Sequence, residues 1–172
     1  MRTLLIALLL AASPAWAAKI AVGDTPPPAL GVDTVGEKID LTQLEGTVVV
    51  LTFWASWCSP CLQELPILEN LQQKVPKDQL RVIAMNIDAD VADYKRIMVH
   101  LENATLTVAR DRNGKIKQRY GVSAIPHMFL IDHHGKVAHM HRGYGPDMLE
   151  GFVGEINALL QARQADAVAA VD

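Results

Sequence analysis

The feature that most constrains this chain is an apolar run that leads directly into its two cysteines. Residues 48–53 read Val-Val-Val-Leu-Thr-Phe, and Trp-Cys-Ser-Pro-Cys follows at 57–61 with the only cysteines of the sequence, Cys58 and Cys61. Such a run is typical of a strand buried on both faces of a largely parallel sheet. A disulfide between these cysteines would close too short a loop to stabilise a fold much. We therefore expect the pair to serve chemistry.

The residues around and after the cysteines predict a helix. Pro60 suits the first turn of a helix, and leucines recur at helical spacing over 62–71. Pro66 lies inside this pattern and should bend the helix rather than end it, because the periodicity continues toward Lys74. Cys58 is thereby placed at a helix N-terminus.

This position predicts different roles for the two cysteines. Unpaired backbone N–H groups and the positive end of the helix dipole favour a thiolate and should lower the pKa of Cys58. Cys61 lies one turn on, where it can attack a mixed disulfide formed at Cys58 and release the partner. The same spacing also begins many zinc sites, but a second ligand pair is missing, which favours redox chemistry.

The rest of the chain alternates predicted strands and helices, which indicates an α/β fold. Strands are expected at 80–87, 105–109, 127–131 and 136–141, and helices at 91–101, 115–120 and 146–160. A small hairpin is expected within 29–41, and Gly121 should end the short third helix in the left-handed conformation.

The N-terminus reads as an export signal. Residues 1–17 combine Arg2, an apolar stretch and a small-x-small cleavage site ending at Ala17. The apolar stretch is shorter than the roughly 20 residues that span a bilayer, so a cleaved signal is favoured over a retained anchor. We therefore predict a periplasmic protein.

The mature chain should form one domain. Residues 18–28 predict an extended linker, because three consecutive prolines lack amide donors. Residues 29–163 are assigned to the domain, and the alanine-rich residues 164–172 are expected to fray. Sixteen Lys and Arg against 19 Asp and Glu give a net charge of −3, which gives no support to nucleic-acid binding.

Several segments together resemble the thioredoxin superfamily. The match lies in residues 53–61, Pro66, 122–126 and 129–132, and it is closest to the TlpA-like branch, exported reductases that include ResA and the cytochrome c maturation thioredoxins. The resemblance implies a thioredoxin-like fold, with a central mixed sheet flanked by helices and an N-terminal hairpin extension. Residues 105–120 look like the strand-helix insertion of that branch.

The resemblance also implies how substrates bind and react. The Ile125-Pro126 bond would be cis and lie against the cysteine pair, shaping a groove for an extended substrate chain. Trp57 abuts the nucleophile and is predicted to form an apolar rim, whereas Trp54 is either core or active-site wall. No cofactor or metal is expected, and the protein should be a monomer.

Glu64 has two interpretations. It lies three residues past Cys61 on the same helical face, where it could move protons to or from that thiol, and proteins resembling ResA carry a glutamate at this spacing. An acidic residue in the first turns of a helix is more commonly a solvated charge. Ordinary thioredoxins place a buried acid where this chain has Thr52, which shifts proton handling toward Glu64.

The predicted function is periplasmic dithiol-disulfide exchange in the direction of reduction. The chain lacks room for the helical insertion of DsbA-like oxidases or for the dimerisation domain of exported isomerases. The expected substrates are disulfide-bearing exported proteins, such as apocytochrome c or a copper-site protein. A membrane thiol electron donor is implied, because exported compartments favour disulfides.

Four late histidines leave a second function open. His133 and His134 fall in a predicted turn and His139 and His141 on one strand face, where the simplest register places His141 opposite His127. A polar sheet face or turn is the favoured explanation. Copper binding by imidazole and thiolate is the alternative, as in a copper-handling thioredoxin-like protein related in fold to Sco-type chaperones, which have a wider C-x-x-x-C spacing.

Overall fold

Strand β3, Val48–Trp54, is the centre of the fold, and all seven of its residues are buried. The computed structural model describes residues 20–170, so the predicted signal at 1–17 lies outside the described residues. The other elements, in chain order, are β1 (Ala29–Val32), β2 (Lys38–Asp40), η1 (Leu41–Leu44), α1 (Ser59–Lys74), β4 (Leu80–Asn86), α2 (Val91–Met98), η2 (Val99–Leu101), β5 (Thr107–Arg110), α3 (Lys115–Arg119), β6 (His127–Ile131), β7 (Val137–Arg142), η3 (Pro146–Met148) and α4 (Leu149–Ala169).

The main sheet is mixed, as the resemblance implied. Its strand order is β5-β4-β3-β6-β7, with β3, β4 and β5 parallel to one another and with β6 and β7 added as antiparallel neighbours. The crossover from β3 to β4 is made by α1, so the helix that begins at the cysteines packs back over the centre of the sheet. The carboxyl end of β3 therefore aims the chain at the cysteine pair.

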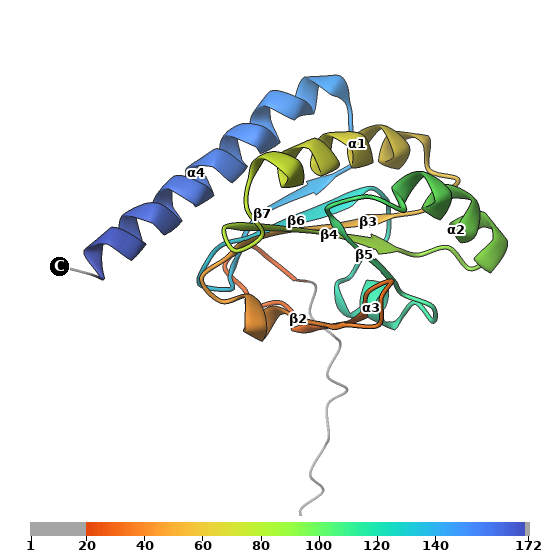
Figure 1. The fold of residues 1–172 in the computed structure, drawn as a ribbon, viewed down its shortest axis with the longest axis horizontal. Helices are drawn as coiled ribbons and strands as arrows, with labels where there is room; N and C mark the ends of the chain where they lie inside the picture. Colours follow the sequence, from red (N-terminus) through yellow and green to blue (C-terminus); the bar gives the residue numbers. More distant parts are fainter. Residues whose placement is uncertain (1–19, 171–172) are drawn as a thin grey trace, which may run out of the picture.

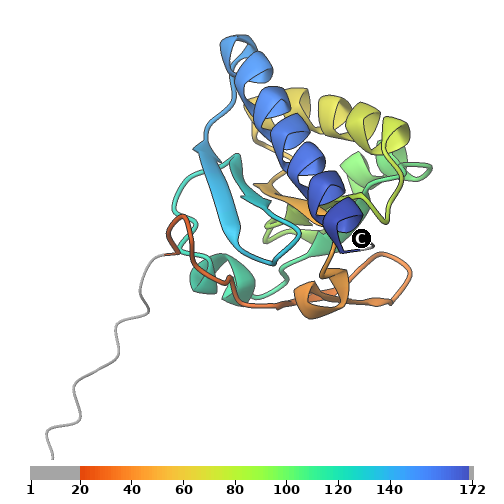
Figure 2. The same cartoon turned by 90° about the vertical axis from the view of Figure 1, so that its left-hand side faces the viewer.

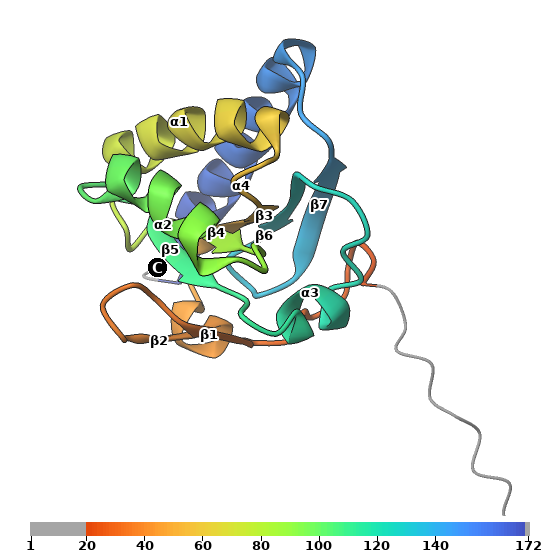
Figure 3. The same cartoon turned by 90° about the vertical axis from the view of Figure 1, so that its right-hand side faces the viewer.

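Helices and a hairpin cover the two faces of the sheet. Figures 1 and 3 show α1, α2 and α4 on one face and the β1–β2 hairpin with α3 on the other. Each interface is a separate apolar core, since alternate residues of β3 point to opposite faces. The thioredoxin-like arrangement with an N-terminal hairpin is confirmed.

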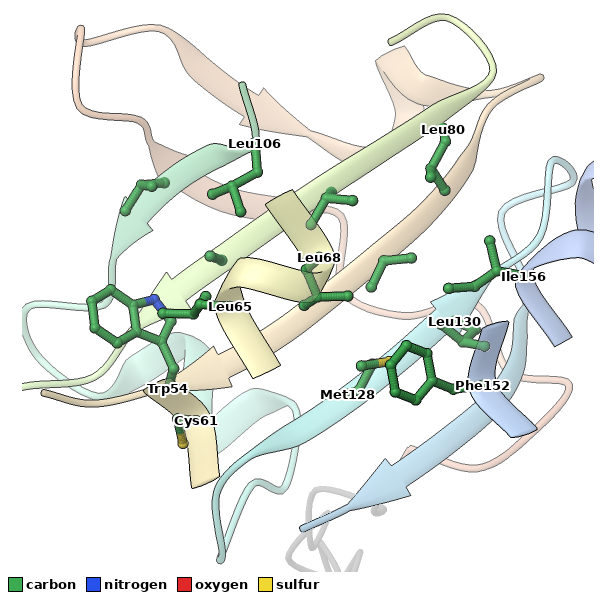
Figure 4. Close-up of a cluster of buried hydrophobic side chains, with 14 of the residues drawn as sticks. Trp54, Cys61, Leu65, Leu68, Leu80, Leu106, Met128, Leu130, Phe152 and Ile156 are labelled. Atoms are coloured by element: carbon green, nitrogen blue, oxygen red, sulfur yellow. The ribbon is translucent and has the colours of Figure 1, made fainter. Parts of the chain in front are cut away.

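The core under α1 extends to the cysteines. Leu65 and Leu68 of α1 pack on the sheet together with Phe152 and Ile156 of α4 (Figure 4). Cys61 lies beside Trp54 at one end of this cluster in the same view. The helical spacing that predicted α1 is thus the spacing of its buried face, and Pro66 stays within the helix.

The segment expected to be a linker is instead bound to the domain. Gly23 N donates to the Val137 carbonyl at 2.8 Å, and Val137 N donates to the Asp24 carbonyl at 2.9 Å. Pro26 is buried, and the Tyr120 hydroxyl donates to the Pro27 carbonyl at 2.7 Å. The prolines remove donors, as expected, but neighbouring residues still pair with β7.

The predicted end of the last helix is wrong. Helix α4 continues to Ala169 instead of ending at Leu160, so residues 164–169 do not fray. Arg163 holds this extension by donating to the Asp78 carbonyl at 3.1 Å and to the Gly46 carbonyl. Figure 2 shows the end of α4 close to the orange segment that precedes β3. Alanine also favours helix intrinsically.

The predicted pairing of His127 with His141 is also wrong. His127 pairs with Arg142, and His141 pairs with Met128. The register of β6 and β7 shifts between Leu130 and Ile131, an irregularity that a simple count from the turn does not include.

Within residues 20–170, the structure contains no helix that is both long enough and apolar enough to cross a lipid bilayer.

Candidate active site

Cys58 and Cys61 form a disulfide at the N-terminus of α1. The S–S distance is 2.02 Å and the Cα atoms are 5.2 Å apart. Cys58 is the N-cap residue, with extended backbone, and its sulfur accepts a hydrogen bond from Cys61 N at 3.3 Å. Pro60 lies in the first helical turn, as predicted. The structure thereby places Cys58 where helix amides can stabilise a negative sulfur.

The two cysteines differ in exposure, although both are largely buried. Cys58 is 5% exposed, whereas Cys61 is completely buried against the core under α1. A partner can therefore approach the disulfide only from the side of Cys58.

The loop between β3 and Cys58 is held by a buried carboxylate, Asp88. Its oxygens accept hydrogen bonds from Ser56 N at 3.0 and 3.2 Å, from the Ser56 hydroxyl at 3.1 Å and from the Asn86 side-chain amide at 2.8 Å. Asp88 follows β4, which is parallel to β3, so both strands end at the same sheet edge. Sequence reasoning missed this residue, although an acid just after a buried strand beside the cysteine strand was the available signal.

Asp88→Ala should lower the free energy of unfolding by about 2 kcal/mol or more, because it leaves Ser56 N and the Asn86 amide without a buried acceptor. Urea denaturation of the oxidised protein measures this. Asp90→Ala is the matched control, since Asp90 is exposed and only caps α2 through Ala92 N. The control should cost about 1 kcal/mol. Equal losses in the two variants would contradict the anchoring of the cysteine loop by Asp88.

Glu64 is buried, which rules out the solvated-charge interpretation. It is 1% exposed, and the Thr52 hydroxyl donates to its Oε2 at 2.7 Å. Burial raises the pKa of Glu64 to about 7, although the hydrogen bond from Thr52 acts in the opposite direction. Glu64 and Cys61 are both buried and stand one helical turn apart on α1. The carboxyl group thus changes protonation near neutral pH within the core beside the disulfide.

The cis proline lies at the same end of the sheet. The Ile125-Pro126 peptide bond is cis, as the resemblance implied. Phe53 pairs with His127, so Pro126 comes level with the end of β3, where the chain turns toward the cysteines. Ile125 is half-buried and packs against both cores.

The two tryptophans of the cysteine segment have opposite surroundings. Trp54 is buried in the core under α1, so of its two predicted roles it is core. Trp57 is 69% exposed directly before Cys58. An exposed indole beside the accessible sulfur gives an incoming chain an apolar contact.

His127 is an unexpected buried polar residue next to Pro126. It is 2% exposed, its ring stacks on Phe129 with centroids 4.5 Å apart, and neither ring nitrogen has a hydrogen-bond partner within residues 20–170. Burial, and to a smaller extent the charge of Arg142, lower the pKa of His127 to about 4. The imidazole is therefore neutral at physiological pH.

His127→Phe should make the protein more resistant to acid. The folded-state pKa of His127 lies below the ordinary 6.5, so its stabilising effect is complete above 6.5 and falls with pH toward 4. When the pH is lowered from 7.5 to 5, the free energy of unfolding of the variant should rise by about 2 kcal/mol relative to that of wild type. Urea denaturation at both pH values checks this, and an unchanged difference between the proteins would contradict it.

The late histidines lie in two separate places. His139 and His141 both face Glu155 of α4, with N–O distances of 3.4 and 2.6 Å. His133 and His134 contact Asp166 near the end of α4. The turn that carries the second pair precedes β7 and adjoins the start of β3, at the opposite end of the sheet from the cysteines.

Comparisons with known proteins agree with this geometry. The family model described as Redoxin matches residues 21–156. Among curated proteins, the thiol-disulfide oxidoreductase ResA of Bacillus thuringiensis (strain Al Hakam) is 36% identical over 140 residues, which are 80% of this chain and 80% of that protein.

Solved structures give the same result. A candidate thiol:disulfide interchange protein DsbE from Chlorobium tepidum superposes with a TM-score of 0.72 at 37% identity, over 83% of this chain and 99% of that one. The exposed lipoprotein thioredoxin Etrx1 of Streptococcus pneumoniae has a TM-score of 0.64 at 28% identity, over 74% of this chain and 96% of that one.

Proposed function

Because the chain belongs to the Redoxin family and to the ResA/TlpA-like branch of the thioredoxin superfamily, and is a thiol-disulfide oxidoreductase, we propose that it reduces disulfides of exported proteins. The observation that carries this proposal is the asymmetric disulfide, in which Cys58 caps α1 and is 5% exposed while Cys61 is completely buried. We assign Cys58 as the nucleophile and Cys61 as the resolving thiol.

The reaction consists of two exchanges. The Cys58 thiolate attacks one sulfur of the substrate disulfide, which forms a mixed disulfide and releases the other substrate sulfur as a thiolate that takes up a proton. The Cys61 thiol then loses its proton and attacks the Cys58 sulfur, which releases the second substrate thiol. Two electrons pass to the substrate, and Cys58 and Cys61 are left as the disulfide seen in the structure.

Glu64 is suited to accept the proton of Cys61. It is buried one turn further along α1, and its raised pKa of about 7 lets it hold or release a proton at neutral pH. A general base works best when its pKa is near the working pH. We assign Glu64 this proton-transfer role, with Thr52 orienting the carboxyl group through its hydroxyl.

The substrate chain is proposed to lie between Trp57 and the Ile125-Pro126 segment. The first is an exposed apolar surface beside Cys58, and the second is the loop that enters β6 at the same end of the sheet. Such a site contacts a few residues around the substrate disulfide. It would accept the extended, unfolded cysteine segments expected of apocytochrome c or of a copper-site protein before metal loading.

The proposed location is the periplasm, and the proposed electron donor is a membrane thiol protein. The N-terminal sequence of an export signal supports the location. Reduction is favoured over oxidation because residues 20–170 form one five-stranded sheet and a two-stranded hairpin, with short connections and no added helical domain.

The direction of exchange is tested by the reduction potential of the cysteine pair. Equilibration with glutathione buffers, followed by alkylation and mass spectrometry, measures it. A reductase should have a potential well below the roughly −180 mV of protein disulfide isomerase. A value near the roughly −120 mV of DsbA would contradict reduction while leaving disulfide exchange intact.

Copper handling receives less support from the geometry. His139 and His141 are engaged with Glu155, and His133 and His134 lie at the far end of the sheet from the cysteines. Copper titration of the reduced protein and of its His141→Ala variant distinguishes the two functions. Stoichiometric, tight binding that His141→Ala abolishes would favour copper handling.

A further inference from the structure

Three metal-capable side chains converge where the β6–β7 turn meets the end of α4. The Nε2 atoms of His133 and His134 lie 2.8 and 3.2 Å from the same carboxylate oxygen of Asp166. One ligand atom from each of the three residues lies within 4.8 Å of those of the other two. Within residues 20–170, this is the only such group of three.

We propose that His133, His134 and Asp166 form a binding site for zinc, remote from the cysteines, that fastens the end of α4 to the β6–β7 turn. Two imidazoles and one carboxylate are ligands that zinc commonly takes, with a fourth position left for water. The ligand types therefore match this ion without the cysteines.

The distances are close to those of a tetrahedral site. Zinc bonds of about 2.0 to 2.2 Å to nitrogen and oxygen put neighbouring ligand atoms about 3.3 Å apart. The observed separations from the Asp166 oxygen, 2.8 and 3.2 Å, need to widen by no more than about half an ångström to admit the ion. Side-chain rotations of this size are small.

The backbone holds both sides of the site in place. Gly46 N donates to the His133 carbonyl at 2.8 Å, and the Asp132 side chain accepts from His134 N at 3.0 Å. On the helix side, Arg163 bonds the Gly46 and Asp78 carbonyls, one turn before Asp166. Both elements are thus tied to the same loop, so the ligands are positioned before an ion arrives.

The histidines are arranged to share one ion. Their rings lie side by side, with centroids 3.9 Å apart. The Nδ1 atom of His133 is buried and has no partner among the described residues, so Nε2 is the nitrogen that His133 presents to a ligand. Arg163 is engaged with carbonyls rather than with Asp166, so the Asp166 carboxylate is bound only by the two imidazoles among the side chains of residues 20–170.

Calorimetric titration with zinc chloride tests the proposal. Untagged full-length protein is stripped of metal with a chelator and kept oxidised, so that the thiols cannot bind the ion and the result does not depend on the proposed reductase activity. We expect one zinc per chain. His134→Gln and Asp166→Asn should each weaken binding by at least about 10-fold to 100-fold, the loss seen even when a group that only hydrogen-bonds to a metal ligand is removed.

His139→Gln is the matched control, since His139 is also partly exposed and also faces a carboxylate of α4. It should leave zinc affinity unchanged. Zinc should also raise the Tm of wild type but not of Asp166→Asn, because an ion that binds only the folded state stabilises it. Affinity weaker than about 1 mM, or equal affinity in wild type and Asp166→Asn, would show that these contacts are ion pairs only.

Discussion

Cys58→Ser abolishes insulin disulfide reduction, with a loss on the order of 10³-fold or more, because serine has no thiolate to attack the substrate. The accessible sulfur at the helix N-terminus is the one replaced, and the buried Cys61 cannot reach a partner in its place. Insulin turbidity in the presence of dithiothreitol, with the reductant-only rate subtracted, measures the effect.

Cys61→Ser is the matched variant, and it gives a different result. The first exchange still occurs at Cys58, but no second thiol displaces the substrate, so mixed disulfides accumulate. Non-reducing gels and mass spectrometry detect them. If Cys61→Ser turned over like wild type, or if Cys58→Ser trapped partners instead, the two roles would have been assigned in the wrong order.

Glu64→Gln should remove most of a pH dependence of stability in the oxidised protein. The pKa of Glu64 is raised to about 7 in the folded protein, against 4.5 in the unfolded chain. Between these values the folded state binds the extra proton, so its stability falls as pH rises from 4.5 to 7. The difference amounts to about 3 kcal/mol. Glutamine keeps the shape and an acceptor for Thr52 but does not ionise.

Urea denaturation from pH 4.5 to 8 measures this, as the difference between variant and wild type at each pH. The difference is needed because His127 acts with the opposite sign over an overlapping range, losing stability as pH falls from 6.5 toward 4. The free energy of unfolding of Glu64→Gln should therefore increase relative to that of wild type as pH rises.

Glu69→Gln is the control on the same helix. Partial burial of Glu69 favours its neutral form, but hydrogen bonds from the Thr105 and Leu106 amides outweigh this and lower its pKa. Its stabilising effect is thus lost only as pH falls below 4.5. If both variants changed the slope of unfolding free energy against pH equally between pH 5 and 8, Glu64 would not be the titrating group.

The sequence predicted those parts of the fold that depend on local pattern. The run that forms β3, the leucine spacing of α1 and the start of α1 at the cysteines all follow from periodicity and helix capping. The left-handed end of α3 at Gly121, with φ of 64°, follows in the same way. These features need no knowledge of distant residues.

The remaining features depend on contacts between segments far apart in the sequence. Glu64 had two interpretations because its burial depends on how α1 packs against Thr52 of β3. Asp88 was missed because its partner, Ser56, lies 32 residues away. Fraying was predicted at the C-terminus because the carbonyl groups that Arg163 binds belong to other loops. Helix propensity and periodicity carry no information on such pairs.

The clasp that Arg163 makes with the Gly46 and Asp78 carbonyls has a consequence for evolution. These hydrogen bonds lie near the start of β3, whereas the disulfide lies beyond the carboxyl end of the same strand. Changes at the clasp can alter how long the folded enzyme survives without altering how fast it exchanges thiols. The lifetime of the folded state and the rate of thiol exchange can thus be selected independently in this chain.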